Sequence, residues 1–547
     1  MDNTADTRGS DRREVEIRLL PVDRVLHALV GEGLLHVLQR ENVALGATCG
    51  GLGTCGECRV RFLTGTPDPT PSDLALLSGE DIEAGWRLAC QQPVWADASI
   101  EITGSRSSHQ VETAKSLEVA PEILQGESSP ANGEGIGVAI DVGTTTLAVY
   151  VFDLASGAML GDAAGYNPQR TMGADVISRI GHVRAYGEAG LKQLQQAVIG
   201  GLNNRVRSAC GQAGAEPKDI LRAVVAGNPT MLHLFMGVSP VGIDQSPFEA
   251  AFLDSVTATS TEVGLDLHPE ARVQLLPGAS SYLGSDVVVG MLATSLGEEG
   301  RTELLVDIGT NGEIVLANDG RFVACSTAAG PAFEGAAIRD GMNAVPGAIE
   351  DVRITGRHVT YSTIGDAPPE GICGTGLIGA VHELLKEGAI DSSGKLLREH
   401  EALSEQFCGE GRHLGFSLAQ SSRRVTLYQE DIRSFQLGKA AIRAGIDTLL
   451  DVTGVAAGDL ERVYIAGAFG THLKPQRALG TGLLPAIPTE RIRPVGNTAG
   501  QGAVMVLLNR SLLGAADALA KRVETIELAT LPEFARRYID RMAFPKT

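Results

Sequence analysis

Four cysteines near the N-terminus constrain the first part of this chain more than any other feature. Three of them lie in the segment C-G-G-L-G-T-C-G-E-C as Cys49, Cys55 and Cys58, and Cys90 follows after 31 further residues. Three thiolates on one short loop and a fourth from a distant strand are suited to hold an iron–sulfur cluster. The loop glycines let the backbone fold closely around an inorganic core and direct N–H groups at its sulfurs.

A structural zinc site is the alternative interpretation. Zinc sites usually join two pairs of closely spaced cysteines, whereas this chain has one such pair, a third cysteine beyond five intervening residues and a lone distant one. The spacing is one residue longer than the plant-type ferredoxin pattern and resembles that of adrenodoxin-like ferredoxins. That resemblance implies a 2Fe–2S cluster, ligated by these four cysteines, in a β-grasp domain.

The residues around the cysteines have the periodicity that such a domain requires. Residues 14–20 alternate like a strand, residues 33–41 have helical spacing, and residues 58–63 and 98–102 are again typical of strands. We therefore predict a ferredoxin-like domain over residues 11–103.

Residues 104–135 are rich in Ser, Gly, Glu and Pro and contain only a short apolar stretch. This composition predicts a linker with limited internal structure, which as a flexible coil spans roughly 30 Å on average. Such a linker would let the cluster domain move between an electron donor and an acceptor.

Composition limits the remaining classes of function. A chain of 547 residues is too long for one core, and its net charge of −20 disfavours nucleic acid or an anionic membrane as a partner. The first fourteen residues carry no apolar signal segment, and no apolar run is long enough to cross a bilayer. The four remaining cysteines are scattered, so we expect a cytoplasmic protein with reduced thiols.

A second strong feature is a repeated motif. The segment A-I-D-V-G-T-T-T places Asp141 between a predicted strand and a turn, and L-V-D-I-G-T-N-G-E repeats this arrangement at Asp307, 166 residues later. Two copies in the same strand–turn–strand context, at the spacing of one α/β domain, indicate a duplicated domain.

The repeated motif has the chemistry of a nucleotide phosphate site. Its glycine lets the turn approach a phosphate, and backbone N–H groups and hydroxyls donate to phosphate oxygens. Its aspartate is suited to hold Mg²⁺ through water or to position an attacking water. We therefore predict that one Mg-triphosphate is clamped between two sets of residues: Asp141, Gly143, Thr144 and Thr145, and Asp307, Gly309, Thr310 and Asn311.

Later signals follow in an order that resembles the actin-like ATPase superfamily. An apolar strand ends in a Gly-rich turn at Gly467 and Gly470, and residues 495–503 open a helix of small residues. The resemblance implies a duplicated ribonuclease H-like α/β fold, in which the turn at Gly467 and Gly470 touches adenosine. We predict two subdomains, residues 136–301 and 302–515, and a C-terminal extension of strand and helix over residues 516–547.

A further Gly-rich turn, G-I-C-G-T-G-L-I-G-A, begins a helix near Gly374 and Gly376. A helix N-terminus with bare glycines suits a nucleotide or another anion. Close helix packing is an equally good explanation, and the sequence does not choose between them.

The two parts together resemble the reductive activators of corrinoid proteins, the RACo type. The resemblance rests on C-G-G-L-G-T-C-G-E-C, Y-N-P-Q-R, A-G-N-P-T-M, C-S-T-A-A-G-P-A-F-E-G and I-C-G-T-G-L besides the repeated motif. It implies an ATP-hydrolysing iron–sulfur enzyme that returns one electron to the Co(II) of a corrinoid methyltransferase and restores Co(I). It also implies a 2Fe–2S cluster, ATP and Mg²⁺ as cofactors, a corrinoid protein and an external low-potential electron donor as partners, and a homodimer.

The segment that begins at Cys325 invites a more speculative hypothesis. Ser326 carries a hydroxyl beside small residues, so a bulky corrinoid could approach it closely, and we consider that it alters the axial ligation of cobalt. The alternative is a turn after the second phosphate motif in which Ser326 caps a helix.

Three other functions stay compatible with the sequence: an ATP-dependent redox activator of a different metalloenzyme, a small-molecule kinase with a redox-regulatory domain, and an ATP-switched redox scaffold. Activators of radical dehydratases use a 4Fe–4S cluster that bridges two identical subunits. The full four-cysteine set in a separate domain disfavours that type, and no sugar site is evident.

Several other polar residues have ordinary structural explanations. The histidines show no H-x-x-x-H or H-E-x-x-H pair, so we expect no second metal site. We expect core packing for Cys325 and Cys373, packing or turn roles for His233 and His472, and turn roles, or places along the cleft, for Asn167, Arg170 and Asn228.

Overall fold

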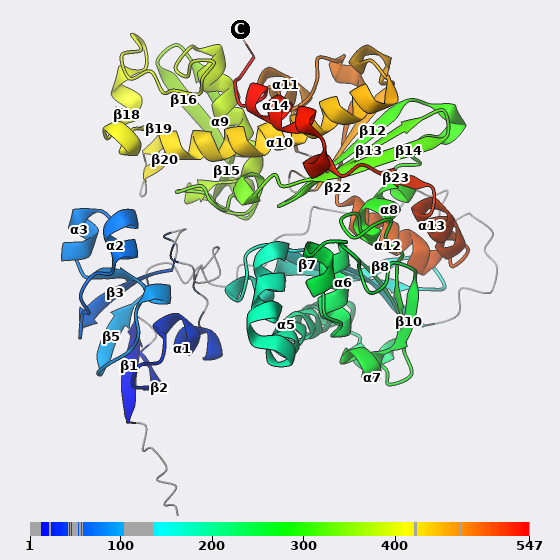
Figure 1. The fold of residues 1–547 in the computed structure, drawn as a ribbon, viewed down its shortest axis with the longest axis horizontal. Coiled ribbons are helices and arrows are strands. Elements are labelled where there is room, and N and C mark those ends of the chain that lie inside the picture. The colour runs from blue at the N-terminus through cyan, green and yellow to red at the C-terminus, as the bar shows by residue number, and fades with distance from the viewer. Residues whose placement is uncertain are drawn as a thin grey trace, which may run out of the picture. The chain divides into compact units, whose positions relative to one another are not determined.

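The computed structural model describes residues 13–20, 23–41, 43, 45, 53, 56, 58–102, 135–420, 424–467, 469 and 472–545 (Figure 1). The chain divides into two compact units, residues 1–108 with 167–198 and residues 109–166 with 199–547. The predicted linker falls almost entirely outside the described residues. Among the described helices, none is both long and apolar enough to cross a membrane.

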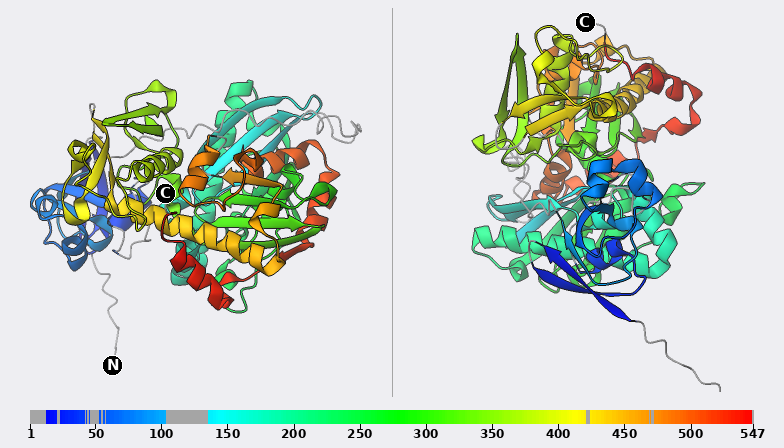
Figure 2. Two further views of the ribbon diagram at one scale, coloured as in Figure 1. Left: turned by 90° about the horizontal axis from the view of Figure 1, so that it is seen from above. Right: turned by 90° about the vertical axis from the view of Figure 1, so that its left-hand side faces the viewer.

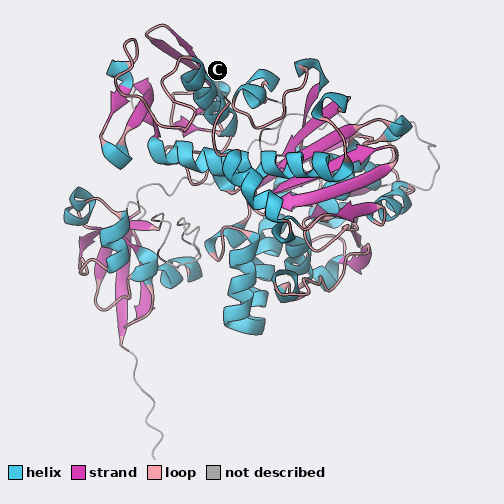
Figure 3. Cartoon of the chain, turned by 45° about the horizontal axis from the view of Figure 1, so that its top comes forward, coloured by secondary structure: helices cyan, strands magenta, loops and turns pink. Residues whose placement is uncertain are grey.

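The N-terminal domain is a five-stranded β-grasp sheet in the order β2-β1-β5-β3-β4. Strand β1 pairs antiparallel with β2 and parallel with β5. Figure 3 shows the strands of this domain in magenta. Alternation in β1 buries Val15, Ile17 and Leu19 against the helix side, which is the pattern the sequence predicted. The elements are β1 (Glu14–Leu20), β2 (Arg24–Leu29), α1 (Leu34–Arg40), β3 (Arg59–Thr64), α2 (Pro71–Leu76), α3 (Gly79–Glu83), β4 (Trp86–Leu88) and β5 (Ala98–Glu101).

The second unit opens with a six-stranded sheet in the order β10-β11-β9-β6-β7-β8. Strands β6, β7 and β8 form an antiparallel meander, and β9 pairs parallel with β6. The first half contains β6 (Ile136–Val142), β7 (Thr146–Asp153), β8 (Met159–Tyr166), β9 (Ile220–Gly227), α6 (Pro229–Met236), β10 (Val256–Thr259), α7 (Ser260–Val263), β11 (Arg272–Leu275) and α8 (Ser285–Ala293). Helix α5 (Val176–Ala213) follows β8 in the chain and is divided between the two units after residue 198.

A second six-stranded sheet, β22-β21-β12-β13-β14-β23, repeats the five-strand arrangement β11-β9-β6-β7-β8 and adds β23 at the edge beside β14. Here β12, β13 and β14 form the meander and β21 pairs parallel with β12, so the predicted duplication is confirmed in the fold. The elements are β12 (Glu303–Ile308), β13 (Gly312–Asn318), β14 (Arg321–Thr327), α10 (Gln429–Thr453), β21 (Arg462–Gly467), α11 (Pro475–Gly480), β22 (Ile492–Gly496), α12 (Thr498–Leu508), α13 (Leu512–Ala520), β23 (Val523–Thr525) and α14 (Pro532–Asp540).

The C-terminal residues contain a strand and a helix, β23 and α14, and the strand completes the second sheet. Strand β23 pairs parallel with β14, and the predicted boundary between residues 515 and 516 falls inside α13. The long helix α10 packs against β13 and β14, where Figure 2 shows it in yellow and orange.

Helices α8 and α12 join the two halves by packing against each other. Helix α8 places Val288 and Val289 in the core of the first half and Val287 and Met291 in a core shared with the second sheet. A helix that is apolar on two faces must be covered on both, so the halves share one continuous interior at this point.

The second half carries an insertion between β14 and α10. It contains a small sheet in the order β16-β15-β17, a second small sheet β18-β19-β20, and helix α9 packed on β15. The bounds are β15 (Ala348–Thr355), β16 (His358–Thr363), β17 (Gly371–Ile372), α9 (Gly374–Lys386), β18 (Phe407–Cys408), β19 (Gly415–Gln420) and β20 (Arg424–Tyr428).

The approach of α9 to β15 predicts a cost for a side chain at Gly376. A Cβ there would collide with the carbonyl of Ile349, so Gly376→Ala should destabilise the larger unit by about 1–3 kcal/mol. Gly514 of α13 is a matched helical control, because nothing lies within 4 Å of a Cβ there, and Gly514→Ala should be neutral or stabilising by about 0.5–1 kcal/mol. Calorimetric unfolding of both variants measures the difference, and equal transition temperatures would contradict it.

Candidate nucleotide and iron–sulfur sites

The two D-x-G-T turns face each other across one cavity of about 600 Å³. Asp141 lies in β6 and Asp307 at the corresponding place in β12. The turns come close enough for the hydroxyl oxygens of Thr145 and Thr310 to form a hydrogen bond of 3.2 Å. The duplicated topology therefore brings both phosphate motifs to a single site.

Local backbone geometry explains the glycines of this site. A Cβ at Gly143 would lie 2.5 Å from the carbonyl oxygen of Thr146. Gly467 has φ of +90°, and a Cβ there would collide with the carboxylate of Asp307. Only glycine fits both positions without displacing the turn.

Most of the predicted nucleotide residues line this cavity. Gly376 does not line the cavity, and its glycine is explained by close packing against the carbonyl of Ile349. Gly374 packs against Phe333 and also lines the cavity. Gly470 lies outside the described residues. The predicted residues that line the cavity are Asp141, Gly143, Thr144, Thr145, Asp307, Gly309, Thr310, Asn311, Gly374 and Gly467.

The cavity is rich in carboxylates. Six carboxylate side chains line it, and its described lining includes no lysine or arginine. Sequence reasoning identified only two of the six. The other four are Asp286 in the first turn of α8, Glu313 on β13, Glu334 at the end of the short turn η7 (Pro331–Glu334), and Glu350 on β15.

Burial and mutual repulsion raise the pKa values of these groups. Burial raises the pKa of Asp307 to about 7, and the nearby charges of Asp286 and Asp141 add to the effect. Burial likewise raises the pKa of Asp141 to about 7, although a hydrogen bond from Asn497 opposes the rise. Burial raises the pKa of Asp286 to about 6 and that of Glu313 well above its usual range. Several buried acids in one cavity strongly favour binding of a cation.

In the part of the chain that the structure describes, no three His, Cys, Asp or Glu side chains are grouped closely enough to hold a metal ion directly. The carboxylates instead come from different walls of the cavity.

Two asparagine caps connect helices to the phosphate motifs. Asn497 caps α12 and donates from Nδ2 to Asp141 Oδ2 at 2.8 Å. Asn228 caps α6 and donates from Nδ2 to Thr144 Oγ1 at 3.0 Å. Sequence patterns placed Asn228 in a turn, and the structure shows that the capping side chain also orients a phosphate-motif hydroxyl.

The other isolated residues divide between core and cavity. Cys325 and Cys373 are buried, as predicted, although Cys373 also lines the cavity at the start of α9. The ring of His233 is fully buried, between the carbonyl of Pro229 at 2.6 Å and the amide of Ala251 at 3.0 Å, which confirms a packing role. His472 lines the cavity beside Phe469. Asn167 caps the turn that contains Arg170.

The alternative prediction, that Ser326 lies in a turn and caps a helix, is wrong. This residue lies within β14 opposite Glu313 of β13, and its hydroxyl donates to Glu313 Oε1 at 3.4 Å. The strand continues through Thr327, so Ser326 is neither in a turn nor at a helix cap. Its contact with cobalt stays a prediction.

Two of the four predicted cluster ligands lie within the described residues. The backbone amide of Cys90 donates to Cys58 Sγ at 3.5 Å. Hydrogen bonds lower the pKa of Cys90 to about 6, and the largest contribution comes from the hydrogen bond with the side chain of Cys58. A thiol of lowered pKa that lies close to a second cysteine fits an iron–sulfur centre. Cys49 and Cys55 lie outside the described residues.

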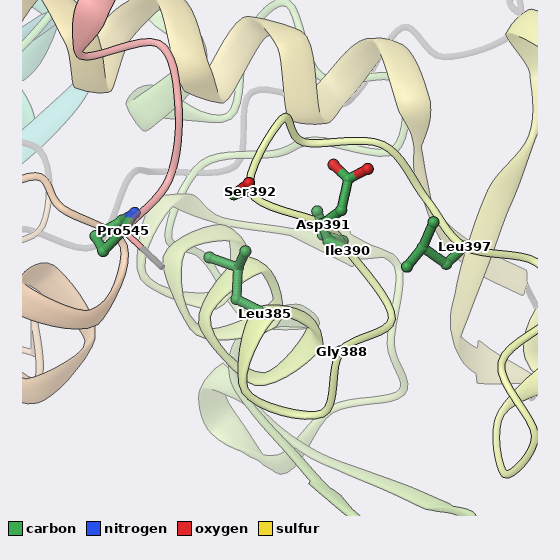
Figure 4. A pocket seen from close by; sticks show the side chains of 7 residues that line it. All are labelled: Leu385, Gly388, Ile390, Asp391, Ser392, Leu397 and Pro545. Atoms are coloured by element: carbon green, nitrogen blue, oxygen red, sulfur yellow. The ribbon is translucent and has the colours of Figure 1, made fainter. Parts of the chain in front are cut away.

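A second, smaller cavity of about 290 Å³ lies beyond the end of α9, next to Pro545 (Figure 4). Its carboxylate is Asp391, whose Oδ1 already accepts hydrogen bonds from the amide and hydroxyl of Ser393 and from the amide of Lys395. These contacts stabilise the local turn, so the residue has a structural explanation.

Fold and sites define a class of protein: a ferredoxin domain followed by a two-lobed, actin-like ATPase. Comparison with known families agrees along the chain. A 2Fe-2S iron-sulfur cluster binding domain matches residues 17–94, the RACo middle region matches residues 136–299, and the C-terminal domain of RACo, the ASKHA domain, matches residues 301–547.

Individual relatives identify the family. The corrinoid activation enzyme RamQ of Eubacterium limosum is 34% identical over 418 residues, which cover 75% of this chain and 70% of that protein. A reductase of Methanosarcina barkeri is 26% identical over a region that covers 59% of this chain and 62% of that protein. Its name refers to a Co(II) methylated amine-specific corrinoid protein. The solved structure of a reductive activator for a corrinoid, iron-sulfur protein matches 97% of this chain and 98% of its own chain, with 31% sequence identity and a TM-score of 0.72. The chain belongs to the family of reductive activators of corrinoid proteins.

The raised pKa values predict a pH dependence of stability. The pKa values of Asp141 and Asp307 rise from 3.8 to about 7 on folding, so between these values the folded protein holds more protons than the unfolded chain. The free energy of unfolding of the metal-free protein should therefore fall as the pH rises from 3.8 to 7. Urea unfolding across this range should show a shallower fall for Asp307→Asn, and parallel curves would refute the assignment.

Proposed function

We propose that this protein is an ATP-dependent reductive activator that passes one electron to the Co(II) of a corrinoid methyltransferase and regenerates Co(I). The observation that carries the proposal is the union, on one chain, of an iron–sulfur domain with a two-lobed cavity lined by both D-x-G-T motifs. The names of its relatives refer to corrinoid activation, which supports the choice of substrate.

The thermodynamics of the reaction explain why a nucleotide is needed. Co(I) is a strong reductant, so electron transfer from a ferredoxin-type centre is uphill, at about 1.4 kcal/mol for each 59 mV. A nucleotide that binds one conformation of the two lobes more tightly can favour a complex in which cobalt is more easily reduced. The cavity between the halves supplies such a binding site.

The residues of the cavity have distinct roles in this proposal. Backbone amides of the two turns and the hydroxyls of Thr144, Thr145 and Thr310 bind phosphate oxygens. Asp141 and Asp307 orient the hydration shell of Mg²⁺. Because the described lining provides carboxylates and no lysine or arginine, the charge of the triphosphate must be balanced by metal ions that enter with it.

The four cysteines would hold the 2Fe–2S cluster, which supplies a one-electron carrier when bound. Cys58 and Cys90 provide two of the thiolates from opposite ends of the β3–β4 segment. The corrinoid protein and an external low-potential donor are the expected partners. A homodimer and a cytoplasmic location stay predictions.

Removal of divalent metal tests the charge argument. Without Mg²⁺ the nucleotide should bind at least about 100-fold more weakly, because an unneutralised triphosphate would face six carboxylates. Isothermal titration with ATP in chelator and in excess Mg²⁺ measures this ratio. Equal affinities with and without metal would contradict the assignment.

The function itself is tested by reduction of a Co(II) corrinoid protein. The reconstituted full chain, a low-potential chemical reductant and ATP should produce the Co(I) absorption band. Omission of ATP, or the Asp307→Asn substitution, should reduce its rate by at least about tenfold, because the lobes then lack the ligand that closes them. An equal band without ATP would exclude the proposed activity, and a phosphorylated small molecule would support a kinase instead.

A further inference from the structure

Gln91 follows the fourth cysteine and turns its side chain back onto it. The amide nitrogen Nε2 lies 3.4 Å from Cys90 Sγ and 3.4 Å from the carbonyl oxygen of Cys90. The residue ends the short turn η1 (Ala89–Gln91) and is half-buried. An amide nitrogen at this distance is a hydrogen-bond donor to the sulfur that the cluster would use.

The surrounding contacts hold this amide in place. The next residue, Gln92, is buried and donates from Nε2 to Asp73 Oδ2 at 2.8 Å, while Asp73 Oδ1 accepts from the amide of Leu88 at 2.7 Å. The backbone on both sides of Cys90 is thereby fixed to α2. The two neighbouring glutamines thus have different partners: Gln91 contacts the sulfur of Cys90, and Gln92 contacts Asp73 of α2.

Gly53 of the cysteine loop leaves the space that Gln91 occupies. A Cβ at Gly53 would lie 2.7 Å from Gln91 Cδ and 2.8 Å from Nε2, and Gly53 has φ of +74°. The loop and the Gln91 side chain therefore fit together only with glycine at this position. The arrangement adds a side-chain donor to the backbone hydrogen bond between Gly53 and Cys90.

A donor to a ligating sulfur stabilises the extra negative charge of a reduced cluster and raises its reduction potential. We propose that Gln91 raises the reduction potential of the iron–sulfur centre through this hydrogen bond. A higher potential makes the centre easier to reduce by its donor but a weaker reductant toward cobalt. Gln91 thereby increases the dependence of the onward transfer on nucleotide, and this second part rests on the proposed function.

The first part is tested with Gln91→Met, which keeps the length of the side chain and removes the donor. In a redox titration of the reconstituted full chain, the ratio of reduced to oxidised cluster at a fixed applied potential should fall about threefold, which corresponds to roughly 30 mV. Gln92→Met is the control for loss of a neighbouring donor, because it removes a donor to Asp73 and not to sulfur, and its potential should move clearly less than that of Gln91→Met. Iron and sulfide content and the electron paramagnetic resonance spectrum report that the cluster is intact.

An unchanged potential in Gln91→Met, or an equal shift in Gln92→Met, would overturn the proposal. If Gln91→Met fails to assemble a cluster, Gln91→Glu decides the question. It retains the reach of the side chain but places a carboxylate near the sulfur, so the potential should fall further, and a potential equal to that of the unmodified chain would again overturn the role.

The second part is tested with Co(II) corrinoid protein as the acceptor. Gln91→Met should narrow the ratio of Co(I) formation rates with and without ATP by at least about threefold, through faster transfer in the absence of nucleotide. A shifted potential with an unchanged ratio would overturn the link to nucleotide dependence and leave the role of Gln91 at the cluster established. No Co(I) formation by the unmodified chain would instead refute the proposed function.

Discussion

The excess of negative charge between the two lobes is the constraint on which the site depends. Asp141 and Asp307 are held opposite each other by a duplicated sheet topology, and Asp286 from α8 adds its charge to the same space. Burial prevents water from screening these groups, so the cavity favours a ligand that carries cations with it. A metal–nucleotide complex has that property, and its binding would relieve repulsion between groups on different walls.

Helix packing connects this charge to the rest of the unit. Asn497 begins α12 and donates to Asp141, and α12 packs against α8, which contributes Asp286 and contacts both cores. A ligand that moves the two motifs relative to each other must therefore act on the α8–α12 pair. This contiguous set of contacts gives the proposed nucleotide-driven closure a physical basis.

The N-terminal domain also places polar groups close to atoms that carry negative charge. In the described part of this domain, polar groups lie close to the cysteine sulfurs, since the amide of Cys90 donates to Cys58 Sγ. The amide of Gln91 adds one more dipole at the same place. These donors would stabilise negative charge on the proposed cluster, whereas the carboxylates of the cavity would stabilise the cations of the proposed metal–nucleotide complex.

The sequence by itself determined the modular plan and the residues of the repeated turns. Cysteine spacing, strand periodicity and the glycine of each D-x-G-T motif are local properties, because a tight turn restricts which residues can occupy it. Only the tertiary structure placed Asp286, Glu313, Glu334 and Glu350 beside those motifs, assigned Gly376 to packing and put Ser326 in a strand. Such placements depend on pairing between segments far apart in the chain, and a single carboxylate or glycine carries no local signal of which distant wall it will face.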